Sequence, residues 1–221
     1  MSFDFDIKTY TPGKIICIGM NYRSHVKEQD GRFPNRPVLF SKAKSSVIKN
    51  GEDIVYPPEV KELDYEVELA VIIGKKMKNV PEAKAADYIY GYTIIDDITA
   101  RDIQKSESQW YRAKSFDSFA PIGPTVVPKK EIPDPQNLKL KSYVNGELRQ
   151  NGNTSDMIYG VYTLLSYISS SITLEEGDLV ATGTPAGVGA FMKHKKLLRP
   201  GDEVICEIEK IGRLTNKIAS P

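Results

Sequence analysis

The sequence is poor in cysteine, in long apolar runs and in excess charge of either sign. Its two cysteines, Cys17 and Cys206, are far apart and form no Cys-x-x-Cys pair, which argues against a disulfide scaffold or a zinc ribbon and suits a reducing compartment. The 30 Lys and Arg against 29 Asp and Glu leave a net charge of +1, so global charge predicts no nucleic-acid or membrane partner. No apolar stretch approaches the roughly 20 residues of a spanning helix, and no secretion signal is recognisable. These absences predict a soluble, cytoplasmic protein.

The most informative stretch is residues 63–74, Leu-Asp-Tyr-Glu-Val-Glu-Leu-Ala-Val-Ile-Ile-Gly. Its second half has the apolar texture of a buried strand. Because residues two apart in a strand share a face, Glu66 and Glu68 point the same way, with Asp64 beyond them. Two neighbouring carboxylates on a buried strand require a cation, unless one of them keeps its proton. A solvated acidic face is the alternative, but the apolar continuation favours a metal site.

A third carboxylate follows the next predicted strand, residues 90–97. Thr99 and Asp102 have the spacing of a capping box, which predicts a helix running to about residue 107. Asp97 would therefore lie at the junction of this strand and this helix. Three carboxylates form a set of hard oxygen ligands that suits Mg²⁺, Mn²⁺ or Ca²⁺ better than zinc. If the fold brings them together, the candidate metal ligands are Glu66, Glu68 and Asp97.

A second candidate group combines a histidine with a glutamate. Ser24 is predicted to cap a short helical turn, on which His25 and Glu28 share a face. A carboxylate beside an imidazole fixes its tautomer and raises its basicity, as a general base acting on water requires. An exposed ion pair fits the spacing equally well. Function is favoured because the chain has only two histidines and because residues 29–35 resemble a mobile loop. The other histidine, His194, lies among lysines and is predicted to be inert.

The remaining patterns predict one domain that is mostly β with a few short helices (α+β). The sequence Asn145-Gly146 predicts a two-residue hairpin turn, and a periodic segment predicts a helix from residue 155 to about 170, capped by Ser155 or Asp156. The glycine-rich loop 183–189 lacks the Walker and dinucleotide patterns, although its backbone N–H groups and Thr184 could hold a carboxylate. Further strands are expected at residues 14–19, 37–42, 125–127, 179–182 and 203–209.

In this order the motifs resemble the fumarylacetoacetate hydrolase family, in particular its short acylpyruvase-type members. The resemblance covers roughly residues 14–212 and depends on the whole set, since Glu-x-Glu alone would carry no weight. The matching motifs are Asn21-Tyr22-x-x-His25-x-x-Glu28, Glu66-x-Glu68, Asp97-x-Thr99-Ala100-Arg101-Asp102-x-Gln104, Lys114-Ser115-Phe116-Asp117 with Pro121-x-Gly123-Pro124, and Gly183-Thr184-Pro185-x-Gly187-Val188-Gly189.

The resemblance implies a mixed β-sandwich roll, usually a homodimer. Residues 1–221 would form a single catalytic domain, with an N-terminal extension at 1–13 and a mobile lid at 20–36. The segment Phe40-Ser41-Lys42-Ala43 departs from the Phe-Leu-Lys-Pro of similar members, so the pocket wall near Lys42 could differ. The resemblance also implies residue roles: Mg²⁺ or Mn²⁺ ligands at Glu66, Glu68 and Asp97, a water-positioning dyad of His25 and Glu28, an active-site lysine at Lys114, and substrate contacts at Lys42, Arg101, Gln104 and Thr184.

The implied chemistry is cleavage of a C–C bond in small 2-oxo acids, either acylpyruvate hydrolysis or oxaloacetate decarboxylation. A divalent ion would act as a Lewis acid on the developing enolate, and Lys114 would add positive charge where the oxyanion forms. An alternative is an isomerase of 2-hydroxyhepta-2,4-diene-1,7-dioate or a related hydroxy-dienoate enzyme. A non-catalytic binding protein is a further alternative, which the concentration of buried charge disfavours.

Overall fold

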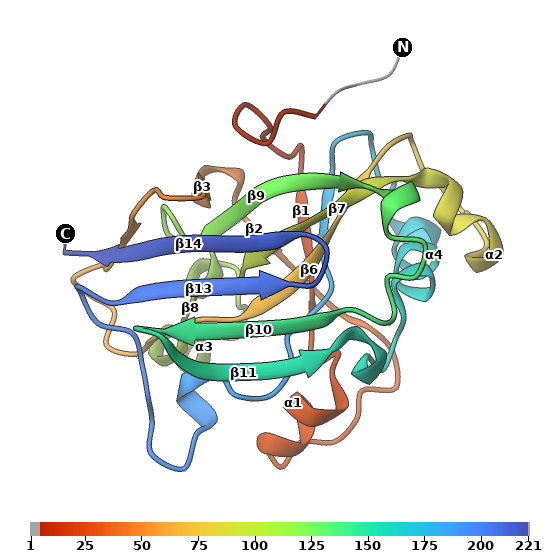
Figure 1. The fold of residues 1–221 in the computed structure, drawn as a ribbon. Helices are drawn as coiled ribbons and strands as arrows, with labels where there is room; N and C mark the ends of the chain where they lie inside the picture. The colour runs from red at the N-terminus through yellow and green to blue at the C-terminus, as the bar shows by residue number, and fades with distance from the viewer. Residues whose placement is uncertain (1–4, 221) are drawn as a thin grey trace.

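Strands are the main regular structure of the computed structural model, which describes residues 5–220 (Figure 1). The larger sheet is mixed, and its strands run in the order β2-β1-β12-β6-β7-β9-β3. The pairs β1–β12 and β3–β9 are parallel, whereas its other pairs are antiparallel. Its strands are β1 (Ile15–Gly19), β2 (Val38–Lys42), β3 (Val47–Lys49), β6 (Val67–Ile73), β7 (Ile89–Asp96), β9 (Ala120–Pro128) and β12 (Leu179–Ala181).

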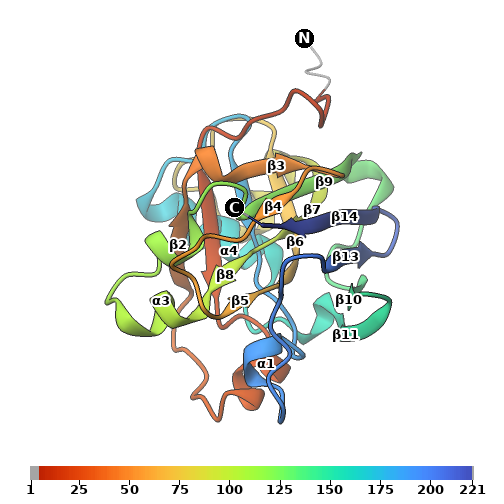
Figure 2. The ribbon, with the colours of Figure 1, turned by 90° about the vertical axis from the view of Figure 1, so that its left-hand side faces the viewer.

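A five-stranded sheet in the order β11-β10-β13-β14-β4 packs across one face of the first, so that β10 and β13 contact β6 and β7 (Figures 1 and 2). A two-stranded ribbon joins β5 to β8. The prediction of a mostly β fold with a few short helices is confirmed. The bounds of these strands are β4 (Ile54–Val55), β5 (Leu63–Asp64), β8 (Thr99–Ala100), β10 (Lys139–Val144), β11 (Glu147–Asn153), β13 (Glu203–Ile208) and β14 (Gly212–Ala219).

The helices are short and lie around the sheets. The longest, α4, packs against α2 and buries Val161, Leu164, Leu165 and Ile168. Among residues 5–220, none of the helices is both long and apolar enough to cross a membrane. The α-helices are α1 (Arg23–Glu28), α2 (Glu82–Ala85), α3 (Arg101–Ser106) and α4 (Val161–Ser171), and the 3₁₀ turns are η1 (Lys44–Ser46), η2 (Ala86–Tyr88), η3 (Arg112–Lys114), η4 (Lys129–Glu131), η5 (Thr154–Asp156) and η6 (Gly189–Phe191).

The sequence of β6 is apolar because the strand is buried on both faces. Leu69 and Val71 belong to the core that includes side chains of the five-stranded sheet, while Ala70 and Ile72 belong to a second cluster with β1 and β12. Burying each of the larger side chains contributes about 1.5–3 kcal/mol. Because alternate residues share a face, Glu68 lies on the same side of β6 as Ala70 and Ile72.

Residues 63–74 do not form the single strand that their pattern predicts. The chain leaves β5 after Asp64 and re-enters a sheet at Val67. Strand β6 then pairs antiparallel with β7, and Val67 lies opposite Asp96. The start of β6 therefore meets the end of β7, and the backbone N–H of Asp97 donates to the carbonyl of Glu66 (2.9 Å). This register brings Glu66 and Asp97 together.

Several predicted boundaries were right and others were not. The hairpin of β10 and β11 is confirmed, with positive φ at both Asn145 (51°) and Gly146 (78°), as a type I′ turn requires. The strand expected at 125–127 begins earlier, at Ala120. The helix expected from residue 155 begins at Val161, whose N–H donates to the Gln136 side chain (2.5 Å).

Candidate metal centre

The three predicted carboxylates converge on one point. Glu66, Glu68 and Asp97 each offer an oxygen within 4.8 Å of the others, and all three side chains are buried. Glu66 and Glu68 come from the start of β6 and Asp97 from the end of β7, so the strand register positions the whole set. Among residues 5–220, no other group of three potential ligands of this kind is found. The spatial meeting predicted from the sequence is confirmed.

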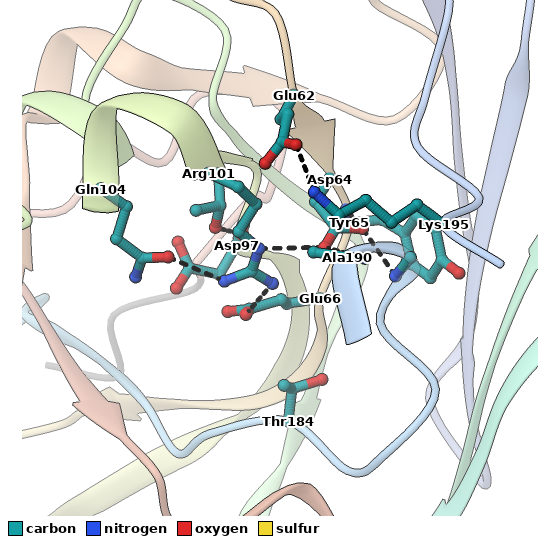
Figure 3. A network of polar contacts seen from close by, with 12 residues as sticks. Glu62, Asp64, Tyr65, Glu66, Asp97, Arg101, Gln104, Thr184, Ala190 and Lys195 are labelled. Carbon is teal, nitrogen blue, oxygen red and sulfur yellow. Dashed lines mark hydrogen bonds and ion pairs between the residues drawn. The ribbon is translucent and has the colours of Figure 1, made fainter. Parts of the chain in front are cut away.

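Three buried cations surround these carboxylates. The Lys114 ammonium lies between Glu66 Oε2 (2.8 Å) and Asp97 Oδ2 (2.6 Å). Arg101 donates from Nη2 to Glu66 Oε1 (2.5 Å), and Figure 3 shows its guanidinium lying between Glu66 and the carboxylate of Asp64. Lys42 donates to the other oxygen of Asp97 (2.5 Å).

The pKa shifts follow from this arrangement. Burial alone would raise the pKa of Glu66, but the charges of Arg101 and Lys114 bring it below its ordinary value. The pKa of Lys114 is raised because Asp97 and Glu66 outweigh the opposite effect of burial. For Glu68, burial raises the pKa well above its ordinary value, and the nearby charges of Asp97 and Glu66 raise it further.

Glu68 provides the test of whether the site fits a metal. Its Oε2 accepts a hydrogen bond from the Gly183 N–H (2.7 Å), and within residues 5–220 no Lys, Arg or His forms an ion pair with it. A buried carboxyl beside two others either keeps its proton or needs a cation, and a divalent ion would supply that cation. Three carboxylate oxygens are the ligands that Mg²⁺ and Mn²⁺ prefer. The donor set therefore fits a divalent ion.

The predicted dyad is assembled on α1. His25 Nδ1 lies 2.7 Å from Glu28 Oε1, and the other Glu28 oxygen accepts the Gly187 N–H (2.8 Å). Ser24 does not cap the helix, because it lies inside α1 and Tyr22 occupies the N-cap position. The Ser24 N–H donates to Asp156 Oδ2 (2.9 Å), and its hydroxyl accepts the Ala186 N–H (3.3 Å). The helix is thus held from both sides by loops that are distant in sequence. Mobility of residues 20–36 remains a prediction.

Two of the three carboxylates, those of Glu66 and Glu68, line a cavity of about 260 Å³. Phe40, Trp110 and Phe191 supply apolar wall. The predicted residues that line this cavity are His25, Glu66, Glu68, Arg101, Gln104, Lys114 and Thr184; Lys42, Asp97 and Glu28 lie behind them. Lys42 is fully buried against Asp97 and the carbonyl of Ile98, so a direct contact of Lys42 with substrate remains a prediction.

Asp64 is a site residue to which the sequence reasoning gave no role. Its Oδ2 accepts Arg101 Nε (2.9 Å) and the Ala190 N–H (3.0 Å), and its Oδ1 accepts the Gly189 N–H (2.8 Å). The same carboxylate therefore fixes both the guanidinium and the turn that carries Phe191. The guanidinium lies over the Phe191 ring (5.6 Å to its centre). The alternation of acidic residues in the sequence includes Asp64. Its partners Arg101 and Gly189 lie 37 and 125 residues away, so no local pattern indicates them.

Gln150 is a second residue that the sequence did not reveal. It is fully buried on β11, and its Oε1 accepts the Val67 N–H (3.0 Å) beside the metal ligands. Its amide nitrogen donates to Thr184 Oγ1 (2.7 Å) and to the carbonyl of Pro185 (2.8 Å). The Thr184 hydroxyl in turn donates to the carbonyl of Val67 (2.9 Å). Gln150 thus joins the glycine-rich loop to the start of β6.

Asp96 lies on the opposite face of β7 from Asp97, as the strand alternation predicts. Burial raises the pKa of Asp96 to about 7, and its Oδ1 accepts the Glu66 N–H (2.8 Å). Cys206 on β13 contacts the same carboxyl, and burial, followed by Asp96, raises the pKa of its thiol. Asp96 therefore holds the backbone of the candidate metal ligand Glu66 through this hydrogen bond.

Comparisons with known proteins agree with this geometry. A family model described as "Fumarylacetoacetate (FAA) hydrolase C-terminal" matches residues 14–219. The oxaloacetate tautomerase Fahd2a, mitochondrial, of Rattus norvegicus is 46% identical over 208 residues, which are 94% of this chain and 66% of the rat protein. This chain thus spans about two thirds of that relative. Because the name of that relative places it in mitochondria, the cytoplasmic location expected from composition remains a prediction.

Two solved structures are also similar. The fumarylacetoacetate hydrolase of Exiguobacterium antarcticum superimposes with a TM-score of 0.91 at 40% identity, covering 100% of this chain and 85% of that one. The 2-hydroxyhepta-2,4-diene-1,7-dioate isomerase of Mycobacterium marinum gives a TM-score of 0.85 at 39% identity, covering 96% and 76%. The names of these relatives describe three different reactions on one scaffold.

Proposed function

The chain belongs to the fumarylacetoacetate hydrolase family, and from that premise we propose that it is a metal-dependent enzyme that enolises a small 2-oxo acid, with keto–enol tautomerisation of oxaloacetate as its reaction. The observation that carries the proposal is the convergence of Glu66, Glu68 and Asp97 on one point, beside a cavity that Glu66, Glu68, Lys114 and Arg101 line. Tautomerisation is preferred because it needs no nucleophile and is the reaction named for a relative at 46% identity.

The charge of the site suits an anionic substrate. With Glu68 ionised, four carboxylates, including Asp64, face three cations. A divalent ion held by Glu66, Glu68 and Asp97 would supply Lewis-acid stabilisation of an enolate. It would also make the net charge of these seven side chains and the ion positive. Arg101 and Lys114, both buried, then add fixed charge at the lining of the cavity, where charges held in place stabilise a developing enolate.

Lys114 is the residue that we assign to proton exchange at the enol oxygen. Its side chain is 2% exposed and lines the cavity. Enolisation removes a proton from carbon 3 of the acid and places one on the oxygen of carbon 2, so both a donor beside that oxygen and an acceptor for the carbon 3 proton are required. Lys114 gives up a proton to the oxygen as an ammonium and takes up the carbon 3 proton as an amine, so its charge is restored at the end of the turnover. Arg101 is held by ion pairs with Asp64 and Glu66. Its Nη1 also donates to Gln104 Oε1 (3.1 Å), which leaves it suited to orienting a carboxylate of the substrate.

Hydrolysis of an acylpyruvate is the second candidate. It is favoured by one observation, the His25–Glu28 pair at the cavity wall (2.7 Å). Hydrolysis needs a base for its water, and a histidine oriented by a carboxylate is suited to that task. Decarboxylation of oxaloacetate would use the same enolate and requires no such base.

The test compares substrates on one preparation of purified protein with Mg²⁺ or Mn²⁺. Keto–enol exchange of oxaloacetate is followed by the absorbance of the enol, its decarboxylation by pyruvate formation, and hydrolysis with acetylpyruvate. We expect metal-dependent acceleration of the keto–enol exchange, lost in Lys114→Met and retained in the exposed control Lys130→Met. If the protein binds metal but leaves the exchange rate at its uncatalysed value, the proposal is wrong.

A further inference from the structure

Gln29 occupies the position on His25 that a nucleophilic water would need. The amide nitrogen of Gln29 lies 2.8 Å from His25 Nε2, and both side chains line the cavity. Gln29 is the residue that ends α1, one turn after His25. Its amide nitrogen also lies 3.3 Å from the carbonyl of His25, so it is held at two points.

The hydrogen-bond partners decide which nitrogen of His25 carries the proton. Glu28 Oε1 can only accept, so Nδ1 donates to it and Nε2 of the neutral ring holds the lone pair. The amide of Gln29 donates to that lone pair, which is the one basic site of the imidazole. The opposite orientation of the amide would place its oxygen against the lone pair and is disfavoured.

The contact is built to persist whenever the dyad is assembled. His25, Glu28 and Gln29 belong to one helical segment, so they move as a unit. Glu28 is fixed by the N–H of Gly187 (2.8 Å), and Asp156 holds the start of the helix. A helix that brings the base to the cavity therefore also brings the amide that covers its lone pair.

We propose that Gln29 sets the type of reaction by excluding hydrolytic water from His25. In hydrolysis the water oxygen bonds to the acyl carbon, the C–C bond breaks towards the enolate, and the water proton passes to Nε2. With Nε2 already bonded to an amide, that proton has no acceptor. Tautomerisation exchanges a proton at carbon for one at oxygen through Lys114 and adds no water, so it does not need the lone pair of His25. The inference rests on the proposed function, because it explains why enolisation does not lead to cleavage.

The test is the ratio of two rates in Gln29→Ala. General-base assistance is worth about 10²–10⁴, so we expect the ratio of acetylpyruvate hydrolysis to oxaloacetate tautomerisation to rise at least about tenfold. The gained hydrolysis should vanish in Gln29→Ala/His25→Ala, because the uncovered lone pair of His25 is then absent. The exposed Gln109→Ala is the matched control and should leave both rates unchanged.

Three results would overturn the inference: an unchanged ratio in folded Gln29→Ala, a gain that survives removal of His25, or efficient hydrolysis by the unaltered protein. Gln29→Met, which keeps the bulk and removes the donor, serves if the alanine variant unfolds. If the proposed function is wrong, the unaltered protein will not tautomerise oxaloacetate. The inference on Gln29 is tested separately, because the gain of hydrolysis is measured with acetylpyruvate.

Discussion

Replacing Asp64 by asparagine should destabilise the protein more than any surface substitution of the same kind. Asp64 is fully buried and accepts hydrogen bonds from Arg101 Nε, Gly189 N–H and Ala190 N–H. In Asp64→Asn one carboxylate oxygen becomes an NH₂ group, which cannot accept. If Oδ1 still accepts the Gly189 N–H, the new NH₂ group lies against two other donors, the Ala190 N–H and Arg101 Nε.

The magnitude follows from the burial of the pair. Arg101 is 2% exposed and keeps Glu66 as an ion-pair partner, so the cost is that of buried donors left unsatisfied, about 1–3 kcal/mol. A domain of this size changes its Tm by about 2–4 °C per kcal/mol, so a decrease of roughly 2–12 °C is expected. The turn that carries Phe191 should loosen as well, which would raise KM for the substrate because Phe191 lines the cavity.

Urea unfolding followed by circular dichroism measures the free energy of unfolding directly. The control is Asp53→Asn, an exposed position, for which a change within about 0.5 kcal/mol is expected. A loss in Asp64→Asn no larger than in Asp53→Asn would refute the reasoning. It would show that Asp64 neither fixes Arg101 nor anchors residues 189–190.

Three other predictions concern the cavity, the helix α1 and the strand behind the site. Lys114→Met should lower the kcat of the enolisation by about 10²-fold or more, since it removes a buried donor and fixed charge from the cavity. Asp156→Ala should remove a partner of the Ser24 N–H that is worth about 1 kcal/mol, so the amides at the start of α1 should exchange hydrogen about fivefold faster. Asp96 has a pKa raised to about 7 by burial, so between about pH 4 and 7 the folded chain holds a proton that the unfolded chain releases, and stability falls as pH rises. In metal-free protein Asp96→Asn should flatten that decline, as urea unfolding at pH 5 and pH 8 would show.

The three carboxylates of the candidate metal centre could be predicted because the patterns that indicate them are local in the sequence. Alternation along β6 placed Glu66 and Glu68 on one face, and the end of the next strand supplied Asp97. The acidic ends of β6 and β7 coincide because the two strands are antiparallel neighbours in the sheet. From the sequence, this pairing could be expected only through the family resemblance.

The capping predictions failed for the opposite reason. Thr99 and Asp102 have the spacing of a capping box, yet the Thr99 hydroxyl donates to the carbonyl of Asp97 (2.9 Å), and Asp102 accepts the N–H groups of Lys61 and Glu62. Short polar side chains bond whichever backbone group the fold brings near. The helix α3 forms without its predicted cap, so tertiary contacts outweighed the local signal.

The most direct test of the central claim is calorimetric titration of the metal-free protein with Mn²⁺. The unaltered chain should bind one ion per chain, and Glu68→Gln should weaken binding by at least about tenfold because it removes a ligand charge from the set. The exposed control Glu59→Gln should bind as the unaltered chain does. Absence of binding to the unaltered protein, or equal affinity in Glu68→Gln, would contradict the assignment of Glu66, Glu68 and Asp97 as a metal site.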